Sequence, residues 1–388
     1  MTIYLDNHST TRLDPRVLEA MLPWLTDHYG NAGSVTHEMG REARTAVDDA
    51  REAIATAIGA TTREIVLTSG ATESNNLAIL GLAARMRPGQ RHVVTVVTEH
   101  HAVLDPVEHL ERDGFAVTRL PVEPGTGLMA PDAVAAALRP DTCLVSVMLA
   151  NNEIGVVHDI PAIAGRVHAQ GAVLHVDCAQ ALGRLPVNVD ALSADLASFS
   201  AHKFHGPKGA GFLYVRRRER VVRIDPLVFG GGQERGLRSG TLDVPGIVGM
   251  AQAARLAVAG LDTEPARLRG LRDRLWTLLQ QHVAGIALNG PPLADPAVRL
   301  VNNLNVRIPG IDGQSLLATL AADGLALSSG SACSSENPRP SHVLLALGLT
   351  DDEARASLRF GLSRFTTDTE IDEAARRIAA GVAKLRAL

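Results

Sequence analysis

The chain has 388 residues, which at roughly 150 residues per domain allows two to three domains and a large core. Hydrophobic residues make up 46% and charged residues 21%, a globular composition that excludes a wholly disordered chain. The chain has 38 lysines and arginines and 42 acidic residues, so its net charge is −4 and it has no excess of basic residues for direct nucleic acid binding.

No apolar run reaches the roughly 18 to 20 residues that cross a bilayer, and the N-terminus lacks the features of a secretory signal. The cysteines are Cys143, Cys178 and Cys333, an odd number and too few for a disulfide framework. We therefore expect a cytoplasmic protein without a membrane partner.

Strands alternate with helices between about residues 60 and 215. Amphipathic stretches such as Glu73–Arg85 and Ile160–Gln170 separate apolar runs, and Asp14-Pro15 predicts the start of a helix running towards His28. This alternation predicts an α/β fold with a mainly parallel sheet covered on both faces. The expected strands are Glu64–Thr68, His92–Val97, Phe115–Leu120, Thr142–Leu149, Ala172–Val176, Asp195–Phe199 and Gly211–Val215.

After Gly240 the pattern changes, which predicts a second, smaller α+β unit with a break near residue 260. Its expected elements are helices at about 243–260 and 262–283, strands at Leu300–Ile308 and Ala356–Ser363, a polar loop at Ser328–Pro340 and a helix from Asp368.

Polar residues follow several of the expected strands, where an open α/β sheet binds ligands. The segment Ser69–Ser74 is either a backbone cradle for a phosphate or a helix start capped by Ser69 or Thr72. Asp177 either caps the next helix or meets a buried cation.

Lys203 follows another strand and is a candidate Schiff-base amine, although an isolated lysine is usually a surface charge. His100 and His101 follow a third strand without zinc-binding spacing, so a stacking or proton-transferring imidazole is favoured over a metal site. An anion cradle, an imidazole, an acid and a lysine together are the parts that bind pyridoxal 5'-phosphate (PLP).

Cys333 lies among small polar residues, which indicates either an accessible thiol that becomes nucleophilic once ionised or an incidental surface cysteine. Cys143 and Cys178 are expected to be packing residues. Two further features fit an anionic ligand: the glycine-rich segment Gly230–Thr241 with its two arginines, and Arg359 in a strand. The run Arg216-Arg217-Arg218 is expected at a solvated strand end.

These motifs, in this order along essentially the whole chain, closely resemble the IscS/NifS-type cysteine desulfurases of the class V aminotransferase family. The resemblance implies a homodimeric PLP enzyme of fold type I, with a large domain at 15–260 and a small domain formed by 1–14 and 261–388. The matching motifs are Tyr4–Asn7, Thr68–Asn76, Thr98–Ala102, Asn151–Gly155, His175–Gln180, Ser200–Gly209, Gly230–Thr241, Ser328–Cys333, Arg359-Phe360 and Arg364–Thr367.

The resemblance also implies how PLP is held. Lys203 would bind it covalently, Asp177 would pair with its ring nitrogen and Gln180 with its ring oxygen. His100 would stack on the ring and take part in catalysis. The phosphate would be bound by five residues, the last from the partner subunit: Ala71, Thr72, Ser200, His202 and Thr241.

By the same resemblance, Asn152 and Arg359 would bind the carboxylate of L-cysteine, and Cys333 would take its sulfur as a persulfide, leaving L-alanine. An acceptor protein, either an Fe–S scaffold or a sulfur carrier, would receive the sulfur for Fe–S cluster assembly or for thiolation of tRNA or cofactors. No resident metal site is expected, although Cys333 could transiently ligate an Fe–S cluster. The chain departs from the family at Val35, where some members have arginine, and at Ala201, where glycine is common.

Three alternatives remain beside the desulfurase. A selenocysteine lyase or another class V PLP enzyme, such as an aminotransferase, would use the same cofactor site; Cys333 argues against the aminotransferase, which needs no loop thiol. A catalytically silent sulfur carrier or scaffold subunit has no need of Lys203, Asp177 and Cys333 together.

Overall fold

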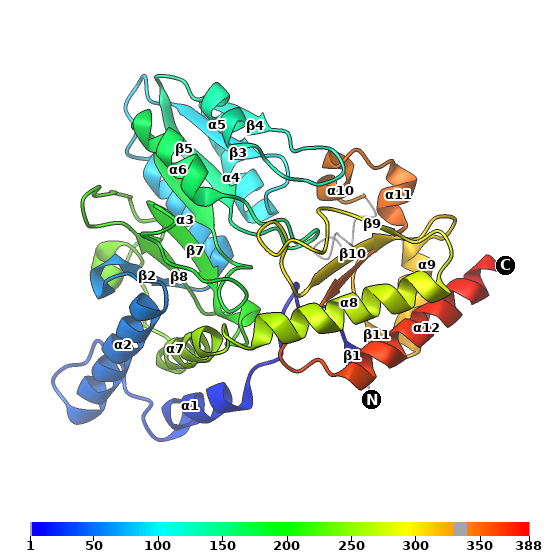
Figure 1. The fold of residues 1–388 in the computed structure, drawn as a ribbon. Coiled ribbons are helices and arrows are strands. Elements are labelled where there is room, and N and C mark those ends of the chain that lie inside the picture. The colour runs from blue at the N-terminus through cyan, green and yellow to red at the C-terminus, as the bar shows by residue number, and fades with distance from the viewer. Residues whose placement is uncertain (1, 330–339, 388) are drawn as a thin grey trace.

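The computed structural model describes residues 2–329 and 340–387. Its main sheet has seven strands. The five neighbouring strands β7-β6-β5-β3-β4 run parallel, so the predicted α/β class is confirmed (Figure 1). β8 runs antiparallel to both of its neighbours. In spatial order the strands are β2 (Ile65–Thr68), β8 (Gly211–Val215), β7 (Leu196–Ser200), β6 (Val173–Asp177), β5 (Thr142–Met148), β3 (His92–Val96) and β4 (Ala116–Leu120).

Helices cover both faces of this sheet, as parallel strands that are apolar throughout require. Buried residues of α3 and α4 form a core on one face, and those of α1, α2, α5, α6 and α7 form a core on the other. The helices are α1 (Pro15–Thr26), α2 (Glu38–Ala57), α3 (Ala71–Ala83), α4 (His101–Arg112), α5 (Pro131–Ala137), α6 (Ile160–Ala169) and α7 (Val244–Ala259).

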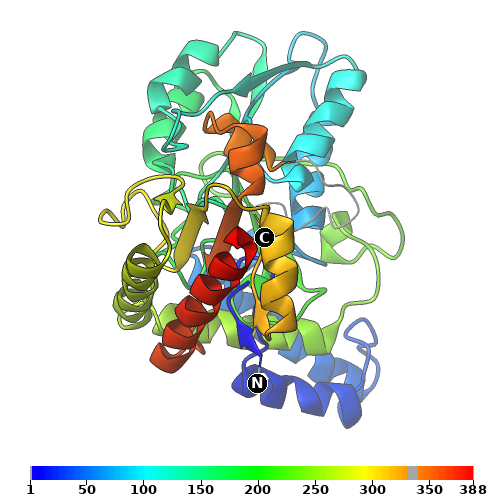
Figure 2. The same cartoon turned by 90° about the vertical axis from the view of Figure 1, so that its right-hand side faces the viewer.

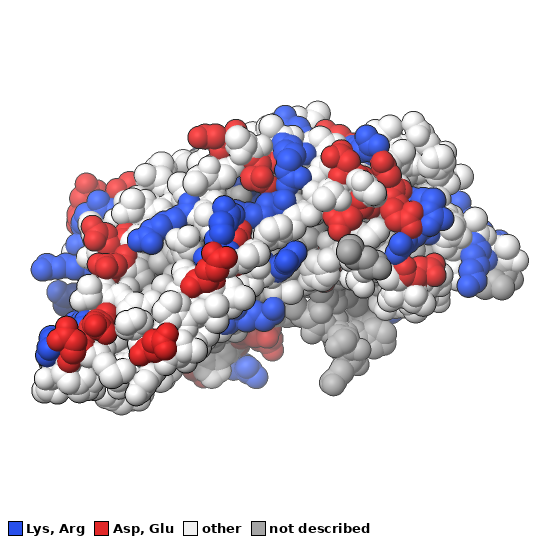
Figure 3. All heavy atoms as spheres, turned by 90° about the horizontal axis from the view of Figure 1, so that it is seen from below, with Lys and Arg blue, Asp and Glu red and all other residues white. Residues whose placement is uncertain are grey.

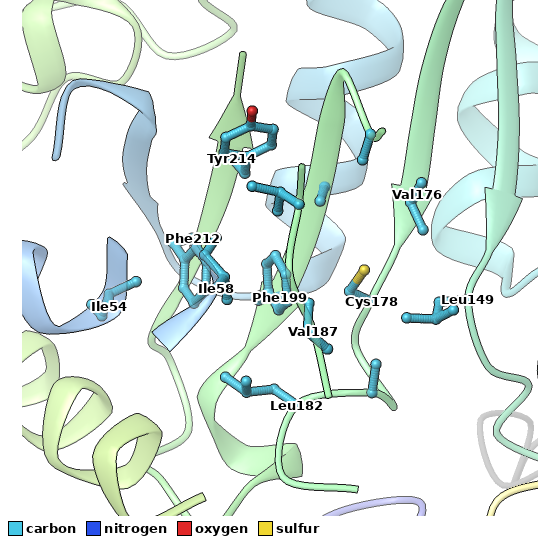
Figure 4. Packing of buried hydrophobic residues seen from close by; sticks show 14 of the residues in the cluster. Ile54, Ile58, Leu149, Val176, Cys178, Leu182, Val187, Phe199, Phe212 and Tyr214 are labelled. Atoms are coloured by element: carbon cyan, nitrogen blue, oxygen red, sulfur yellow. The ribbon is translucent and has the colours of Figure 1, made fainter. Parts of the chain in front are cut away.

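Figure 4 shows the larger of these cores. The rings of Phe199 and Phe212 stack with their centroids 4.4 Å apart, beside Ile58. Cys178 is fully buried in this core near Val176, and Cys143 is buried in the core on the opposite face. Both cysteines are therefore packing residues, as predicted.

Most of the remaining chain surrounds a third core, in which Ile3 and Leu5 from the N-terminus pack with residues between 268 and 382, whereas the buried residues of 343–354 pack with Ile154 and Val156. Helices α8 and α12 lie side by side against this core (Figures 1 and 2). This shared core supports the proposed division into 15–260 and 1–14 with 261–388. The elements are β1 (Ile3–Tyr4), α8 (Glu264–His282), β9 (Ala287–Leu288), β10 (Asn303–Arg307), α9 (Gly313–Ala322), β11 (Leu325–Ala326), α10 (His342–Ala346), α11 (Asp351–Arg355), β12 (Ser357–Gly361) and α12 (Asp368–Arg386).

One local prediction was wrong. Arg216, expected at a solvated strand end, is only 6% exposed. Its guanidinium donates hydrogen bonds to the carbonyls of Ala194 (2.9 Å) and Val189 (3.1 Å) and lies 3.1 Å from the Asp190 carboxylate. The loop that precedes β7 folds over the end of β8 and supplies these acceptors, so the charge is buried with partners.

Across the described residues, no single helix is both long and apolar enough to span a membrane. α7 and α8 meet that criterion only as a pair, and the pair bends by 78°.

His175 in the centre of the sheet makes the stability of the fold depend on pH. Its ring nitrogens lie 2.8 Å from Ser146 Oγ and 2.9 Å from Ser198 Oγ, and burial lowers its pKa from 6.5 to about 4. As the pH falls below 6.5 the unfolded chain takes up a proton that the folded chain does not, so stability is lost over the window from 6.5 down to about 4. Between pH 7 and pH 5 we expect this residue to account for a loss of about 2 kcal/mol.

Urea unfolding at the two pH values checks this expectation. The pH-dependent loss should shrink by about that amount in His175→Asn, and it should stay at the wild-type size in His109→Asn, whose ring is exposed. An unchanged loss in His175→Asn would contradict the assignment.

Candidate active site

A cavity of about 670 Å³ lies at the carboxyl ends of the parallel strands, where the N-terminal segment and β12 approach the main sheet. The structure brings most of the predicted site residues together in its wall: Ala71, Thr72, His100, Asn152, Asp177, Gln180, Ser200, His202, Lys203 and Arg359. Thr241 is exposed and does not line the cavity. Cys333 lies outside the described residues.

The start of α3 is arranged as an anion cradle. Gly70 is the N-cap residue, and no side chain caps the helix, so the alternative in which Ser69 or Thr72 caps it is wrong. Gly70 has φ = +150°, and a Cβ on Gly211 would come within 2.4 Å of the Gly70 Cα, so two glycines permit this close approach. An uncapped helix N-terminus in a cavity wall fits a phosphate group.

Asp177 is placed by the end of β6 and is 5% exposed. Its Oδ1 accepts a hydrogen bond from the Ala179 backbone (2.9 Å), and its Oδ2 accepts one from Asn75 Nδ2 (2.8 Å). No ion pair found in 2–329 or 340–387 includes this carboxylate. A buried carboxylate held by two donors suits a cationic ring nitrogen. Asn75, which orients this carboxylate, was not among the predicted site residues.

Lys203 follows β7 on a single turn of 3-10 helix and is half-buried. Its Nζ donates hydrogen bonds to the carbonyl oxygens of His8 (2.6 Å) and Ser9 (2.7 Å). The segment His8–Thr10 therefore lines the site beside the lysine, although no role was predicted for it.

Gln180 is held by a buried network. Its Nε2 donates to the carbonyl of His8 (2.9 Å), and its Oε1 accepts from Arg184 and lies 3.1 Å from His8 Nδ1. Burial, and then the charges of Arg184 and Arg359, lower the pKa of His8 well below its usual value, so its ring is neutral. Burial lowers the pKa of Arg184 to about 10, so its guanidinium keeps its charge near pH 7. Neither His8 nor Arg184 has a local sequence signal.

His100 is the N-cap residue of α4, and its Nδ1 accepts a hydrogen bond from the Ala102 backbone (3.0 Å). This bond assigns the ring proton to Nε2. Burial lowers the pKa of His100, so the ring is neutral near pH 7. A neutral, flat imidazole in the wall suits stacking and proton transfer. In the described parts of the chain, no three His, Cys, Asp or Glu side chains are placed to hold a metal ion.

Arg359 on β12 brings a positive charge to the same end of the cavity as Lys203. It is 1% exposed, and its Nη2 donates to Asp6 Oδ1 (2.8 Å) and Ser9 Oγ (2.7 Å). Its Nη1 donates to the carbonyl of Asn152 (3.3 Å). These contacts fix Arg359 beside Asn152, an arrangement that suits a carboxylate ligand.

Two buried carboxyl groups in the wall were not predicted. Burial raises the pKa of Glu99 well above its usual value, and its Oε1 accepts from the Met148 backbone (2.7 Å). Burial raises the pKa of Glu153 to about 7, and its Oε2 accepts from Ser341 Oγ (2.5 Å). Neither was distinguished from its motif neighbours, because the sequence does not show which acids are desolvated.

The glycine-rich segment Gly230–Thr241 lies outside the wall, and both of its arginines have protein partners. Arg235 donates to the carbonyl of Ile65 (2.7 Å), and Arg238 pairs with Glu73, which lines the cavity (2.8 Å). The expectation that these arginines bind an anionic ligand directly therefore does not hold within this chain.

The sequence profile of the family described as "Aminotransferase class-V" matches residues 3–373. The "Cysteine desulfurase IscS" of Anaeromyxobacter dehalogenans (strain 2CP-C) is 51% identical over 384 residues, which cover 99% of this chain and 93% of that protein. The solved structure named "NIFS-LIKE PROTEIN" has a TM-score of 0.91 at 37% identity, covering 99% of this chain and all of that one. The structure "SspA in complex with cysteine" has a TM-score of 0.81 at 35% identity and covers 94% of this chain and all of that one.

Proposed function

Because this chain belongs to the class-V aminotransferase family, we propose that it is a PLP-dependent cysteine desulfurase of fold type I, which converts L-cysteine to L-alanine and carries the sulfur as a persulfide. The observation that carries the proposal is the single cavity wall in which Lys203, Asp177, His100 and the start of α3 meet. A solved relative bound to cysteine supports the choice of substrate.

The residues present fit PLP. The uncapped start of α3 with Ser200 and His202 would hold its phosphate, Asp177 its ring nitrogen, Gln180 its ring oxygen and Lys203 its aldehyde carbon. When bound, PLP supplies a carbon that condenses with amines and a ring that accepts electron density from the substrate's Cα.

The side chains then have distinct tasks. Arg359 and Asn152 would hold the substrate carboxylate, so that the Cα proton faces the Lys203 amine. Once the substrate amine has taken its place on the cofactor, the free lysine amine would remove this proton, and the Asp177 carboxylate would pair with the ring nitrogen. His100 would cover the ring of the cofactor, and it holds a proton on Nε2 that it could transfer.

Cys333 completes the sulfur transfer. Its thiolate attacks the sulfur of the substrate, forming an S–S bond, while the bonding pair of the cleaved C–S bond stays on the substrate Cβ. That carbon takes a proton to become the methyl group of alanine, the Lys203 amine would return a proton to Cα, and Cys333 is left as a persulfide. An acceptor protein, an Fe–S scaffold or a sulfur carrier, would then receive the sulfur.

The enzyme incubated with L-cysteine and a thiol reductant should turn over with equal amounts of alanine and sulfide. Cys333→Ser should keep the yellow colour of bound PLP and lose sulfide release. Cys143→Ala, which changes a buried packing cysteine, is the matched control and should keep both. Sulfide release at the wild-type rate from Cys333→Ser would refute the persulfide, and turnover of selenocysteine alone would favour the selenocysteine lyase.

We also propose a homodimer. Leu18, Leu22 and Leu25 form an exposed apolar stripe along α1, and Tyr29 and Phe229 are 73% and 79% exposed. Such a surface favours burial against a second copy. Thr241, exposed on its glycine-rich segment, would reach the phosphate of that partner.

A cytoplasmic location is proposed because Cys143 and Cys178 are unpaired and buried, which suits a reducing compartment. On the face that Figure 3 shows, positive and negative side chains are interspersed. This distribution supports the expectation that nucleic acid is not bound directly there.

A further inference from the structure

A carboxylate lies in the first turn of α3, beside the cradle proposed for the cofactor's phosphate. Glu73 lines the cavity with Ser69, Gly70, Ala71 and Thr72, and its Oε2 accepts a hydrogen bond from the Ser69 backbone (2.7 Å). A negative charge at this position opposes a phosphate dianion at the positive end of the same helix. An acid here therefore needs a compensating charge.

Arg238 supplies that charge from the glycine-rich segment. Its Nε donates to Glu73 Oε1 (2.8 Å) and its Nη2 to Oε2 (3.3 Å), and the two side chains are only 25% and 19% exposed. Although burial raises the pKa of Glu73, the hydrogen bonds from Arg238 and Ser69 outweigh it and lower the pKa below its usual value. Glu73 is therefore ionised near pH 7, and the pair has no net charge.

The remaining groups of the wall do not replace Arg238. Lys203 is assigned to the aldehyde carbon of the cofactor, Lys208 is exposed, and Arg359 is paired with Asp6 (2.8 Å). Burial lowers the pKa of His202 to about 4, so its ring adds no charge near pH 7. Asp177 is bound by Asn75 at the end of β6, and burial raises the pKa of Glu99 well above its usual value. Glu73 is thus the acid of the cradle itself, and Arg238 is its counter-ion.

The segment that carries Arg238 is held in place. Glu234 receives two hydrogen bonds from Arg51 (2.6 and 2.7 Å) and one from the Leu67 backbone (2.8 Å). Glu234 and Arg235 both have positive φ, 49° and 58°. Such backbone conformations cost energy for residues other than glycine, and here the contacts of Glu234 hold the turn in them. The turn that carries Arg238 is therefore already held by its own contacts. No loop has to become ordered when an anion binds, so that entropic cost is avoided.

We propose that Arg238 sets the affinity of the cradle for a phosphate monoester by neutralising Glu73, a role that rests on the proposed PLP function. Glu73 in turn orders the turn before α3 through the Ser69 amide. Both are positioning residues. The Glu73 carboxylate is tolerated beside the phosphate only while Arg238 pairs with it. Removal of the Glu73 charge should therefore restore the phosphate affinity that is lost when Arg238 is replaced.

A double-substitution cycle on the holoenzyme tests this role. The PLP dissociation constant is measured from cofactor release on dilution of each holoenzyme. Arg238→Gln should weaken binding on the order of tenfold, because an uncompensated charge then faces the phosphate. Glu73→Gln alone should not weaken it, and the double variant should return to within about threefold of the wild type. Competition by inorganic phosphate should follow the same order, since this probe forms no covalent bond to Lys203.

Arg85→Gln is the matched control, because it breaks an ion pair with Asp225 just beyond the other end of α3 (2.6 Å, both side chains about 40% exposed) and should leave the dissociation constant unchanged. If Glu73→Gln weakens PLP binding as much as Arg238→Gln and the double variant is the weakest, the pair is merely structural and the inference fails. If the wild-type protein binds no PLP and makes no alanine, the proposed function itself fails, whatever the cycle shows.

Discussion

Replacing Lys203 with alanine is expected to reduce alanine formation from L-cysteine by about 10³-fold or more, because the amine both holds the cofactor and moves the Cα proton. The carbonyls of His8 and Ser9 fix its Nζ in the cavity, and among the described residues no second amine has these partners. Borohydride reduction followed by mass measurement should find PLP attached to the wild-type chain and absent from the variant.

Lys384→Ala, which changes a lysine in the last turn of α12, is the control and should keep the wild-type rate and the attached cofactor. Turnover by Lys203→Ala at the wild-type rate would refute the assignment. Loss of activity with PLP still attached would place the covalent link on another residue.

The second large effect concerns stability. Glu234→Ala is expected to lower the free energy of unfolding by about 3–5 kcal/mol, because it leaves the Arg51 charge buried without its partner. Arg51 and Glu234 have side-chain exposures of 10% and 1%, and the Leu67 amide would also lose its acceptor. Urea unfolding of the holoenzyme at a fixed protomer concentration measures the loss.

Glu38→Ala is the matched control, since its ion pair with Arg41 is exposed at 77% and 51%, and it should change stability by less than about 1 kcal/mol. A double variant, Arg51→Met with Glu234→Leu, should recover most of the loss by removing both charges. An equal loss in Glu38→Ala and Glu234→Ala would show that burial of the pair is not what matters.

The sequence predicted the parts of this fold that are encoded locally. Every expected strand of the main sheet was found within one residue or so of its predicted ends, because runs of buried Val, Ile and Leu carry that signal. The cavity residues at strand ends, such as Asp177 and Lys203, followed from the same pattern. α2 was not predicted, since its N-cap is His37 and not one of the usual capping residues.

Contacts between distant segments could not be predicted. The carbonyls that hold Lys203 lie 195 and 194 residues away along the chain, and Arg184 reaches Asn7 across 177 residues. No local periodicity encodes such pairings. The partners of Glu73 and Glu234 were missed for the same reason, because a salt bridge is a property of the packed structure.

The contacts along the free edge of β2 affect whether another β-strand can pair with the main sheet. β2 ends the main sheet, and its outward carbonyl at Ile65 and amide at Leu67 are already bonded to Arg51, Arg235 and Glu234. A foreign β-strand that approached this margin would have to displace a buried ion pair before it gained one backbone hydrogen bond. The sheet is thereby closed to strand addition on this side, which disfavours edge-to-edge aggregation even though the strand itself is apolar.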